Sequence, residues 1–327
     1  MSATIKDTYA RRVRTFARGS ESVLITTSVI GFVVLASTTH GNLLTRGTLT
    51  AIFQFLAVPV IVGLAQMVVL GVGQMNLSVG VLTGFCSMVA AWLMIRLGVP
   101  AWLAVVGAVG VGAMAGLING VIVVLTRING FIVTLATMTI IDGLRYGING
   151  TSTFQGYSPS LVRFGKGSSL GVPNVFLVAM AVAALVAVFF RRTVAGRRLL
   201  ASGGNPLAAR LSGVSNDRSI VIAHMISGLL AGVAGVLEVA LSGSVNATIG
   251  DDLLLPSFAA PIIGGVALAG GVISVLGTCL AAFIMRMVDV ARAQYSIDPS
   301  WVDVIIGVVV LGAVLLTQLR HRGGGPR

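Results

Sequence analysis

The chain has 327 residues, of which 56% are hydrophobic and only 10% are charged, and its mean hydropathy is +0.98. This composition excludes an ordinary soluble domain. The formal net charge of +12 does not indicate nucleic-acid binding, because no stretch is long and polar enough to fold into a soluble domain with a basic face.

Long apolar runs recur along almost the whole sequence. A hydrocarbon core about 30 Å thick needs roughly 20 apolar residues per helix. The runs are continuous rather than alternating, which favours helices over membrane strands. We therefore predict an all-α polytopic membrane protein with about ten transmembrane helices. The predicted spans are 22–39, 49–71, 77–96, 101–125, 130–148, 172–190, 219–240, 253–271, 272–291 and 301–319.

A basic N-terminal segment, 1–21, precedes the first span. Signal peptides share this pattern, but no clear small-residue cleavage site follows the apolar run, so we predict an uncleaved first helix. Basic residues collect in loops that stay in the cytoplasm, and with ten spans most of them fall on the side of the N-terminus. The sequence thus predicts a membrane domain at 22–319 between two cytoplasmic ends, 1–21 and 320–327.

Polar side chains interrupt the apolar runs at three places. Such groups are costly in lipid, so they face the bundle interior or a cavity. Amides and hydroxyls both donate and accept hydrogen bonds, which suits a neutral polyhydroxylated solute. For each residue taken singly, a role in tying helices together is the alternative. The polar candidates to line a solute path are Gln74, Asn76, Ser78, Asn119, Asn129, Thr134, Thr137 and Glu238.

Glycines recur every four residues on two of the predicted helices. They are Gly112, Gly116 and Gly120 on the fourth helix and Gly228 and Gly232 on the seventh. Small residues at this spacing let helix backbones approach closely. The pattern predicts a compact bundle.

The longest predicted cytoplasmic segment, 191–218, contains a short helix of its own. Asn205 can cap a helix, Pro206 suits its first position, and the residues from Leu207 to Leu211 form one or two turns before Gly213. The flanking arginines could serve as a simple anchor at the lipid headgroups, which does not account for the capped helix. A rigid knob outside the membrane is suited to receive a push from a cytoplasmic partner.

The boundary between the eighth and ninth predicted spans is glycine-rich. Gly264, Gly265, Gly270 and Gly271 mark either a tight turn or a broken helix. The only two cysteines, Cys86 and Cys279, lie inside apolar runs, which indicates buried thiols rather than a disulfide or a zinc site.

Several motifs occur in an order that points to one family. They are Gly73–Gly80 after the second span, Phe131–Met138 at the fifth, Gly196–Gly213 in the cytoplasmic segment, Leu237–Ala240 closing the seventh span, and Gly264–Gly265 with Leu268–Gly271. Together they resemble the ribose-type (pentose and hexose) sugar permeases of bacterial ABC importers. That superfamily also contains nucleoside, autoinducer and branched-chain amino acid permeases.

The resemblance implies a fold like that of type II ABC importer permeases, with an internal pseudo-repeat, in the bacterial inner membrane. It implies three partners: ATPase subunits that use ATP and Mg, a second permease copy or a paralogue, and an extracytoplasmic substrate-binding protein. It also adds Phe131 to the path candidates. The ATPase-coupling residues it implies are Gly203, Gly204, Asn205, Pro206, Ala208, Ala209, Arg210, Leu211, Ser212 and Gly213.

The chain itself is not predicted to be an enzyme. Its only lysines, Lys6 and Lys166, stand outside any Gly-x-x-x-x-Gly-Lys-Ser/Thr frame, so a phosphate-binding loop is absent from the sequence. His40, His224 and His321 are too scattered to form a catalytic site. We expect neither a cofactor nor a metal bound by this chain, and we expect its energy to come from the partner ATPase.

Two questions stay open at this point. Asn76 stands where members of the family commonly carry an acidic residue, and Pro256 and Pro261 interrupt the eighth span, so a monosaccharide is expected without a named sugar. The alternative class is a secondary transporter of a small polar solute. It would need membrane carboxylates arranged as an ion site, and the acidic residues in or beside spans do not form one in the sequence: Asp142, Glu238, Asp289 and Asp303.

Overall fold

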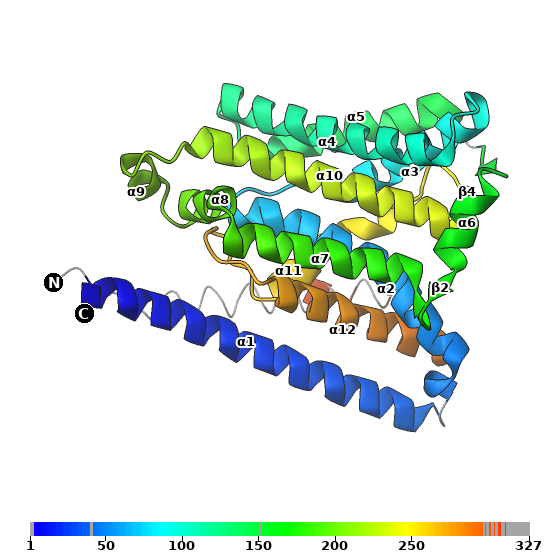
Figure 1. The fold of residues 1–327 in the computed structure, drawn as a ribbon, viewed down its shortest axis with the longest axis horizontal. Helices are drawn as coiled ribbons and strands as arrows, with labels where there is room; N and C mark the ends of the chain where they lie inside the picture. Colours follow the sequence, from blue (N-terminus) through cyan, green and yellow to red (C-terminus); the bar gives the residue numbers. More distant parts are fainter. Residues whose placement is uncertain are drawn as a thin grey trace.

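The computed structural model describes residues 3–39, 42–150, 152–296 and 298, together with 301, 304, 307, 308 and 311; the side chains of 3–20, 42 and 149 are not described. Most of the predicted tenth helix, 301–319, and all of the predicted tail, 320–327, lie outside the described residues. The described chain is a bundle of long helices whose two ends differ (Figure 1).

Helices dominate the described ranges, and the four strands are each two residues long. In chain order the elements are α1 (Ala3–Thr38), η1 (Asn42–Leu44), α2 (Arg46–Gly71), α3 (Val79–Arg96), α4 (Ala101–Thr126), α5 (Gly130–Asn149), β1 (Phe154–Gln155), α6 (Pro159–Lys166), β2 (Ser168–Ser169), β3 (Val172–Pro173), α7 (Asn174–Arg192), α8 (Val194–Gly204), α9 (Pro206–Leu211), α10 (Asn216–Ser242), β4 (Ser244–Val245), η2 (Asp251–Leu253), α11 (Leu254–Ile263) and α12 (Val275–Gln294).

Among the described residues, seven helices are long and apolar enough to cross a membrane. They are Glu21–Thr38 within α1, then α2, α3 and α4, Gly130–Ile148 within α5, and α7 and α10. These seven coincide with the first seven predicted spans. The first helix differs at its start, because α1 continues from Ala3 through the basic segment that was predicted to precede it. That segment contains no proline to stop a helix.

The predicted eighth span, 253–271, is not one continuous helix. The turn η2 leads into α11, which ends after ten residues, about 15 Å of helix. Irregular backbone follows from Gly264 to Ser274, and α12 then begins at Val275 in place of the predicted ninth span at 272–291. The glycines therefore lie in a turn-containing irregular segment that separates α11 from α12. Gly270 and Gly271 have φ angles of +89° and +81°, a region that only glycine enters at low cost.

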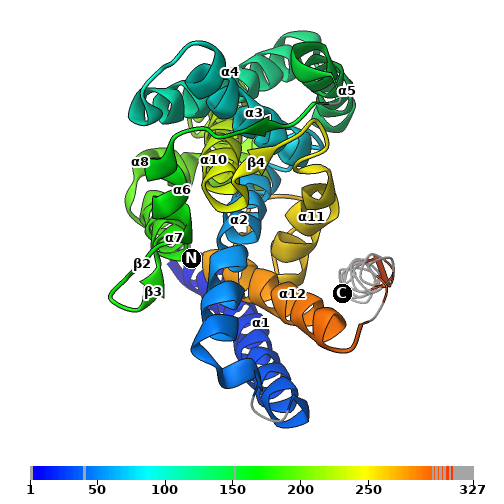
Figure 2. The same cartoon turned by 90° about the vertical axis from the view of Figure 1, so that its right-hand side faces the viewer.

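The centre of the bundle is built from α2 and α10 (Figure 2). Every residue of α2 from Val60 to Gly71 is buried, and α10 packs against α2, α3 and α4. At the periphery, α1 packs on α12. Lipid tails are as apolar as leucine, so close contact between helices rather than expulsion of water holds such a bundle together.

The glycine rows of α4 and α10 face each other directly. A Cβ atom added at Gly112 would lie 2.4 Å from the carbonyl oxygen of Gly228, and one at Gly116 would lie 2.2 Å from that of His224. A Cβ at Gly120 would lie 2.7 Å from Cα of Val221. The close approach of helix backbones that the spacing predicts is confirmed.

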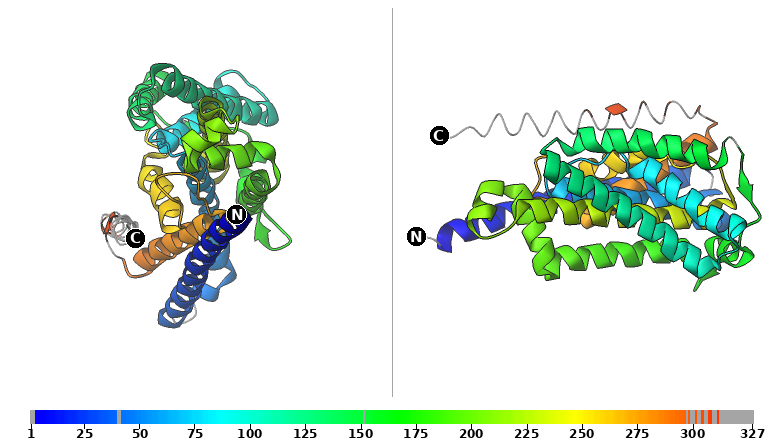
Figure 3. Two further views of the ribbon diagram at one scale, coloured as in Figure 1. Left: turned by 90° about the vertical axis from the view of Figure 1, so that its left-hand side faces the viewer. Right: turned by 90° about the horizontal axis from the view of Figure 1, so that it is seen from above.

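The two ends of the bundle carry different structures. The "α9 end" holds α8, α9 and the start of α1 (Figures 1 and 3). The "β4 end" holds α6 and the short strands: β1 pairs with β4 in antiparallel register, Phe154 with Val245, and β2 pairs with β3. The strand pairs provide backbone hydrogen bonds to connections that leave the helices.

Substitution of Gly116 by alanine is expected to destabilise the bundle, because the new methyl group would force α4 and α10 apart. A cost of about 1–3 kcal/mol follows from overpacking of this kind. The midpoint of thermal unfolding of the purified chain in detergent measures it. Gly110→Ala is the matched control on α4, since a Cβ there meets no atom within 4 Å; equal midpoints for the two variants would contradict the close-packing interpretation.

Candidate functional site

The predicted knob in the 191–218 segment is present, and it is larger than the sequence indicates. The predicted short helix is α9, and the side chain of Asn205 accepts a hydrogen bond from the backbone N–H of Ala208 at 3.0 Å, as its capping role requires. A second helix, α8, precedes it and was not predicted. Thr193 caps α8 by accepting a hydrogen bond from the N–H of Gly196. Glycine has a low helix propensity, so the glycines of α8 made this helix hard to predict from the sequence.

One asparagine that sequence analysis missed holds the two knob helices together. Asn216, the first residue of α10, accepts a hydrogen bond from the hydroxyl of Ser202 on α8 and donates one to the carbonyl of Pro206 on α9, both at 2.9 Å. Leu207 and Leu211 on α9 are 71% and 82% exposed. The result is a rigid knob that presents apolar side chains away from the bundle.

Two breaks interrupt the helices beside the knob: residues 72–78 between α2 and α3, and residues 264–274 between α11 and α12. The knob touches both through a cluster of glycines, Gly71, Gly203, Gly270 and Gly271, here called the glycine junction. The backbone N–H of Gly271 donates to the carbonyl of Gly71 at 3.0 Å. A Cβ at Gly203 would lie 2.1 Å from that same carbonyl oxygen and 2.9 Å from N of Gly271. The end of α8 therefore contacts the end of α2 and the irregular segment before α12.

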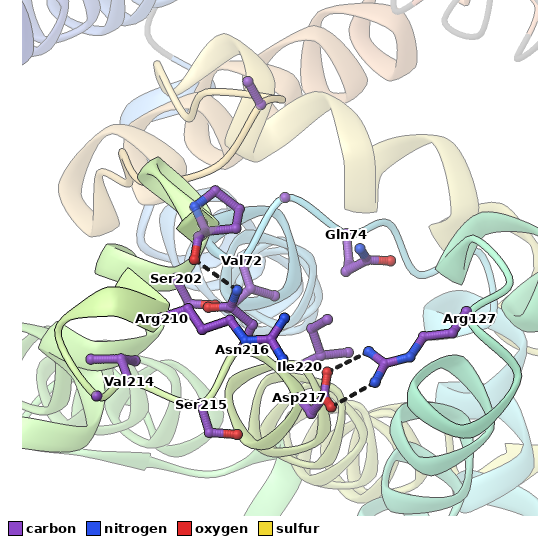
Figure 4. Close-up of a pocket in the computed structure, with 15 residues that line it drawn as sticks. Val72, Gln74, Arg127, Ser202, Arg210, Val214, Ser215, Asn216, Asp217 and Ile220 are labelled. Carbon is purple, nitrogen blue, oxygen red and sulfur yellow. Dashed lines mark hydrogen bonds and ion pairs between the residues drawn. The ribbon is translucent and has the colours of Figure 1, made fainter. Parts of the chain in front are cut away.

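A hollow of about 630 Å³ lies beside the glycine junction at the α9 end (Figure 4). It is lined by Val72, Gly73, Gln74, Arg127, Ser202, Gly203, Pro206, Arg210, 213–217, Ile220 and Ala269. Arg127, after α4, makes a two-point ion pair with Asp217 of α10, at 2.6 and 3.0 Å. Both side chains are exposed to solvent, so this pair contributes little to stability. It joins α4 to α10 beside the knob.

Six of the nine predicted path residues lie close together and are joined by buried or partly buried hydrogen bonds. Asn76 donates to Ser227 of α10 at 3.1 Å and accepts from the hydroxyl of Ser78 at 2.7 Å. Asn119 of α4 donates to Ser78 at 3.3 Å and accepts from Thr137 of α5 at 2.6 Å.

Two further contacts continue this network along the 72–78 break. Thr134 accepts from the N–H of Leu77, and Gln74 accepts from the N–H of Gly130 at the start of α5. The network thus ties the break to α4, α5 and α10. Such satisfied polar groups match the helix-tying alternative in this conformation.

The other three predicted path residues lie apart from this network. Asn129 is exposed and caps α5 by accepting from the N–H of Phe131, which is itself 43% exposed. Glu238 lies near the β4 end of α10, half-buried, one turn before Ser242, whose hydroxyl donates to the Glu238 carbonyl. The structure does not bring these three side chains together.

Two buried polar residues on the central helices were missed by sequence analysis. In the described part of the chain, both side-chain polar atoms of Gln66 on α2 and both ring nitrogens of His224 on α10 lack a hydrogen-bond partner, although both residues are fully buried. Unpaired groups of this kind are costly, so a water or solute hydrogen-bonded to them would stabilise the site. The available signal was the amide of Gln66 deep inside the apolar run 49–71.

The described residues hold no group of His, Cys, Asp or Glu that could bind a metal ion. Cys86 is buried and Cys279 is half-buried, and neither is in a disulfide. The described residues thus combine a network of polar side chains that form hydrogen bonds, a close backbone contact at the glycine junction and an exposed knob.

Comparison with known proteins identifies a family. Residues 48–314 match the family described as "Branched-chain amino acid transport system / permease component". The chain is 32% identical over 305 residues to the fructose import permease protein of Rhizobium meliloti, covering 90% of this chain and 84% of that protein. It is 31% identical over 298 residues to the ribose import permease protein of Escherichia coli strain K12, covering 90% and 92% of the two chains.

A third relative is the galactose/methyl galactoside import permease protein of Haemophilus influenzae, 31% identical over 230 residues, with 68% of each chain covered. No solved structure gives a significant match.

Removal of the Asn119 amide is expected to destabilise the chain, because Ser78 and Thr137 would lose a buried partner. The cost expected for an unsatisfied buried group is about 1–3 kcal/mol, seen as a lower midpoint of thermal unfolding for Asn119→Ala. Thr139→Ala is the control, since that exposed hydroxyl bonds the carbonyl of Leu135 on its own helix. An unchanged midpoint for Asn119→Ala, combined with altered uptake, would instead assign Asn119 to the solute path.

Proposed function

The chain belongs to the family of branched-chain amino acid transport system permease components, and on that premise we propose that it is the transmembrane permease subunit of an ATP-binding-cassette importer. The transported solute is small and polar, and a monosaccharide fits best. Alternating access driven by partner ATPases moves it across the inner membrane. A nucleoside, an autoinducer or a branched-chain amino acid is the alternative within the same class.

One observation carries the proposal of ATP-driven transport: the glycine junction places a rigid knob in contact with both breaks in the membrane helices. The exposed Leu207 and Leu211 give a cytoplasmic ATPase an apolar surface to bind. A push on α9 reaches α8 through Asn216, and then Gly71 and Gly271 through Gly203. Discrete rearrangement of packed elements is how such a push becomes a conformational change.

The choice of solute rests on side-chain chemistry and on the names of the relatives. Amides and hydroxyls near the 72–78 break, with the unpaired Gln66 and His224, form hydrogen bonds without carrying charge. The relatives named for fructose, ribose and galactose cover most of this chain. The path candidates remain Gln74, Asn76, Ser78, Asn119, Asn129, Phe131, Thr134, Thr137 and Glu238.

The proposed complex contains two permease subunits, either two copies of this chain or one copy with a paralogue. ATPase subunits that bind ATP and Mg contact the residues from Gly203 to Gly213, and an extracytoplasmic substrate-binding protein delivers the solute. In this arrangement the α9 end faces the cytoplasm. Ten crossings with both termini inside, related by an internal pseudo-repeat, are the matching topology.

A secondary transporter is disfavoured by the arginine partners of two of the four acidic residues in or beside the predicted spans. Asp142 pairs with Arg145, and Asp289 lies 3.7 Å from Arg286. Carboxylates already engaged by arginines are poorly placed to bind a coupling cation.

Uptake of radiolabelled sugar tests the function. Proteoliposomes containing this chain, its ATPase and its binding protein are expected to accumulate ribose, fructose or galactose only when ATP and Mg are supplied on the ATPase side. The measurement is retained label with ATP compared with a non-hydrolysable analogue. Accumulation driven by a proton gradient without the ATPase would favour the secondary transporter.

Substitution of Gly203 by alanine is expected to uncouple the knob from the helix breaks, since the methyl group would overlap the carbonyl of Gly71. ATP hydrolysis should continue while the amount of sugar moved per ATP falls about tenfold or more, because a small displacement of a packed element has a large effect on a coupled step. Both rates are measured in the same proteoliposomes, with Gly110→Ala as control. Normal coupling in Gly203→Ala would remove the glycine junction from the mechanism.

A further inference from the structure

Arg145, near the β4 end of α5, is fully buried and has no role in the transport path described above. It is the largest of the side chains with essentially no exposed surface. One of its terminal nitrogens donates to the carbonyl of Ile249 at 2.8 Å, and the other makes ion pairs with Asp142 and, at 2.6 Å, with Asp251. A buried guanidinium is costly unless such partners surround it.

These partners come from two segments far apart in the sequence. Asp142 lies one turn earlier on α5, whereas Ile249 and Asp251 belong to the connection from β4 to η2. Both carboxylates are about half exposed, with Asp142 at 47% and Asp251 at 49%, while the arginine is enclosed. The guanidinium therefore anchors the connection from the inside.

The same connection lies against α3 through glycines. A Cβ at Gly84 would fall 1.8 Å from the carbonyl oxygen of Ile249, and one at Gly80 would fall 2.9 Å from that of Gly250. Gly250 has a φ of +88°. The backbone of residues 249–251 is thus held between α3 and Arg145, an arrangement here called the Arg145 clamp.

The helix α11 and the irregular segment after it connect this clamp to the knob along the chain. The connection passes through η2 directly into α11, which ends at Ile263, and residues 264–271 then reach the glycine junction. Along its length α11 packs against α2 and α12. The continuous chain from residue 249 to residue 271 is therefore the route by which a movement at the glycine junction would reach the clamp.

We infer that the Arg145 clamp is the gate at the β4 end of the solute path, with Arg145 as its positioning residue. Arg145 holds residues 249–251 in the closed position. A movement that starts at the glycine junction displaces α11 and thereby releases these residues. This inference rests on the proposed function, because it gives α11 the task of linking ATP-driven movement of the knob to access from the opposite face. Arg145 positions backbone and carboxylates and does not itself bind the solute.

Thiol accessibility tests the clamp without ATP or solute. The full chain, with Cys86 and Cys279 replaced by serine, carries one reporter cysteine at Ala247, which is 3% exposed in the held connection. In lipid nanodiscs both faces are open to a polar maleimide, so membrane orientation does not matter. The labelling rate reports how often the connection opens.

Arg145→Gln is expected to raise the labelling rate at position 247 about tenfold or more, because two carboxylates and one carbonyl lose a shared donor. Arg163→Gln, an exposed arginine on α6 at the same end, is the matched control and should label like the parent. A second reporter at Ala179, buried on α7, should stay unlabelled in both. A rise at both reporters would mean general unfolding and would overturn the clamp.

Conservative variants keep the test decisive if Arg145→Gln fails to fold. Asp142→Asn and Asp251→Asn keep the size of each side chain and weaken one ion pair each. Each is expected to raise labelling at position 247 severalfold, and the double variant more than either. If the double variant is labelled at position 247 at the same rate as the parent protein, the inference is wrong.

The labelling result and the uptake result are separable. If ATP-driven uptake is found and the clamp variants label like the parent, only the clamp is wrong. If the clamp variants label as expected and uptake does not depend on ATP, the gate stands and its link to an ATPase fails.

Discussion

Lack of water in the membrane interior is the constraint on which this structure depends. Backbone groups outside helices must find partners within the protein at that depth, and two of the segments where the chain leaves helical geometry, 72–78 and 264–274, lie against the buried end of α2. Both breaks are stabilised by hydrogen bonds to the backbone of other segments: the N–H of Gly271 donates to the carbonyl of Gly71, and the side chain of Gln74 accepts from the N–H of Gly130. The absence of side chains at the glycine junction permits the first of these contacts.

The broken segments concentrate both the polar chemistry and the mechanical contacts. The 72–78 break is joined to three helices by amides and hydroxyls, whereas the 264–274 break is joined to the knob through backbone. A serine adds a third contact: Ser274 caps α12 and donates to Glu21 of α1 at 2.8 Å. The peripheral first helix is therefore connected to the same break that contacts α8.

Hydropathy predicts the first seven spans well because a span is a local property of the sequence. The capped α9 was also predictable, since Asn205 and Pro206 act within one turn. The helix α8 was not, because its Gly196 and Gly203 disfavour a helix locally and are accommodated only by contacts with Phe189 and Gly71. Pairings such as Asn76 with Ser227 and Arg145 with Asp251 join residues about a hundred or more positions apart, so composition and spacing could propose the residues but not the partners.

The interlocked glycines of α4 and α10 limit how this protein can move. Carbonyl oxygens of one helix occupy the space that side chains of the other would fill, so neither helix can slide along its neighbour by a turn without collision. A rearrangement that preserves this contact therefore moves α4 and α10 together as one unit, and the other helices change position relative to that unit.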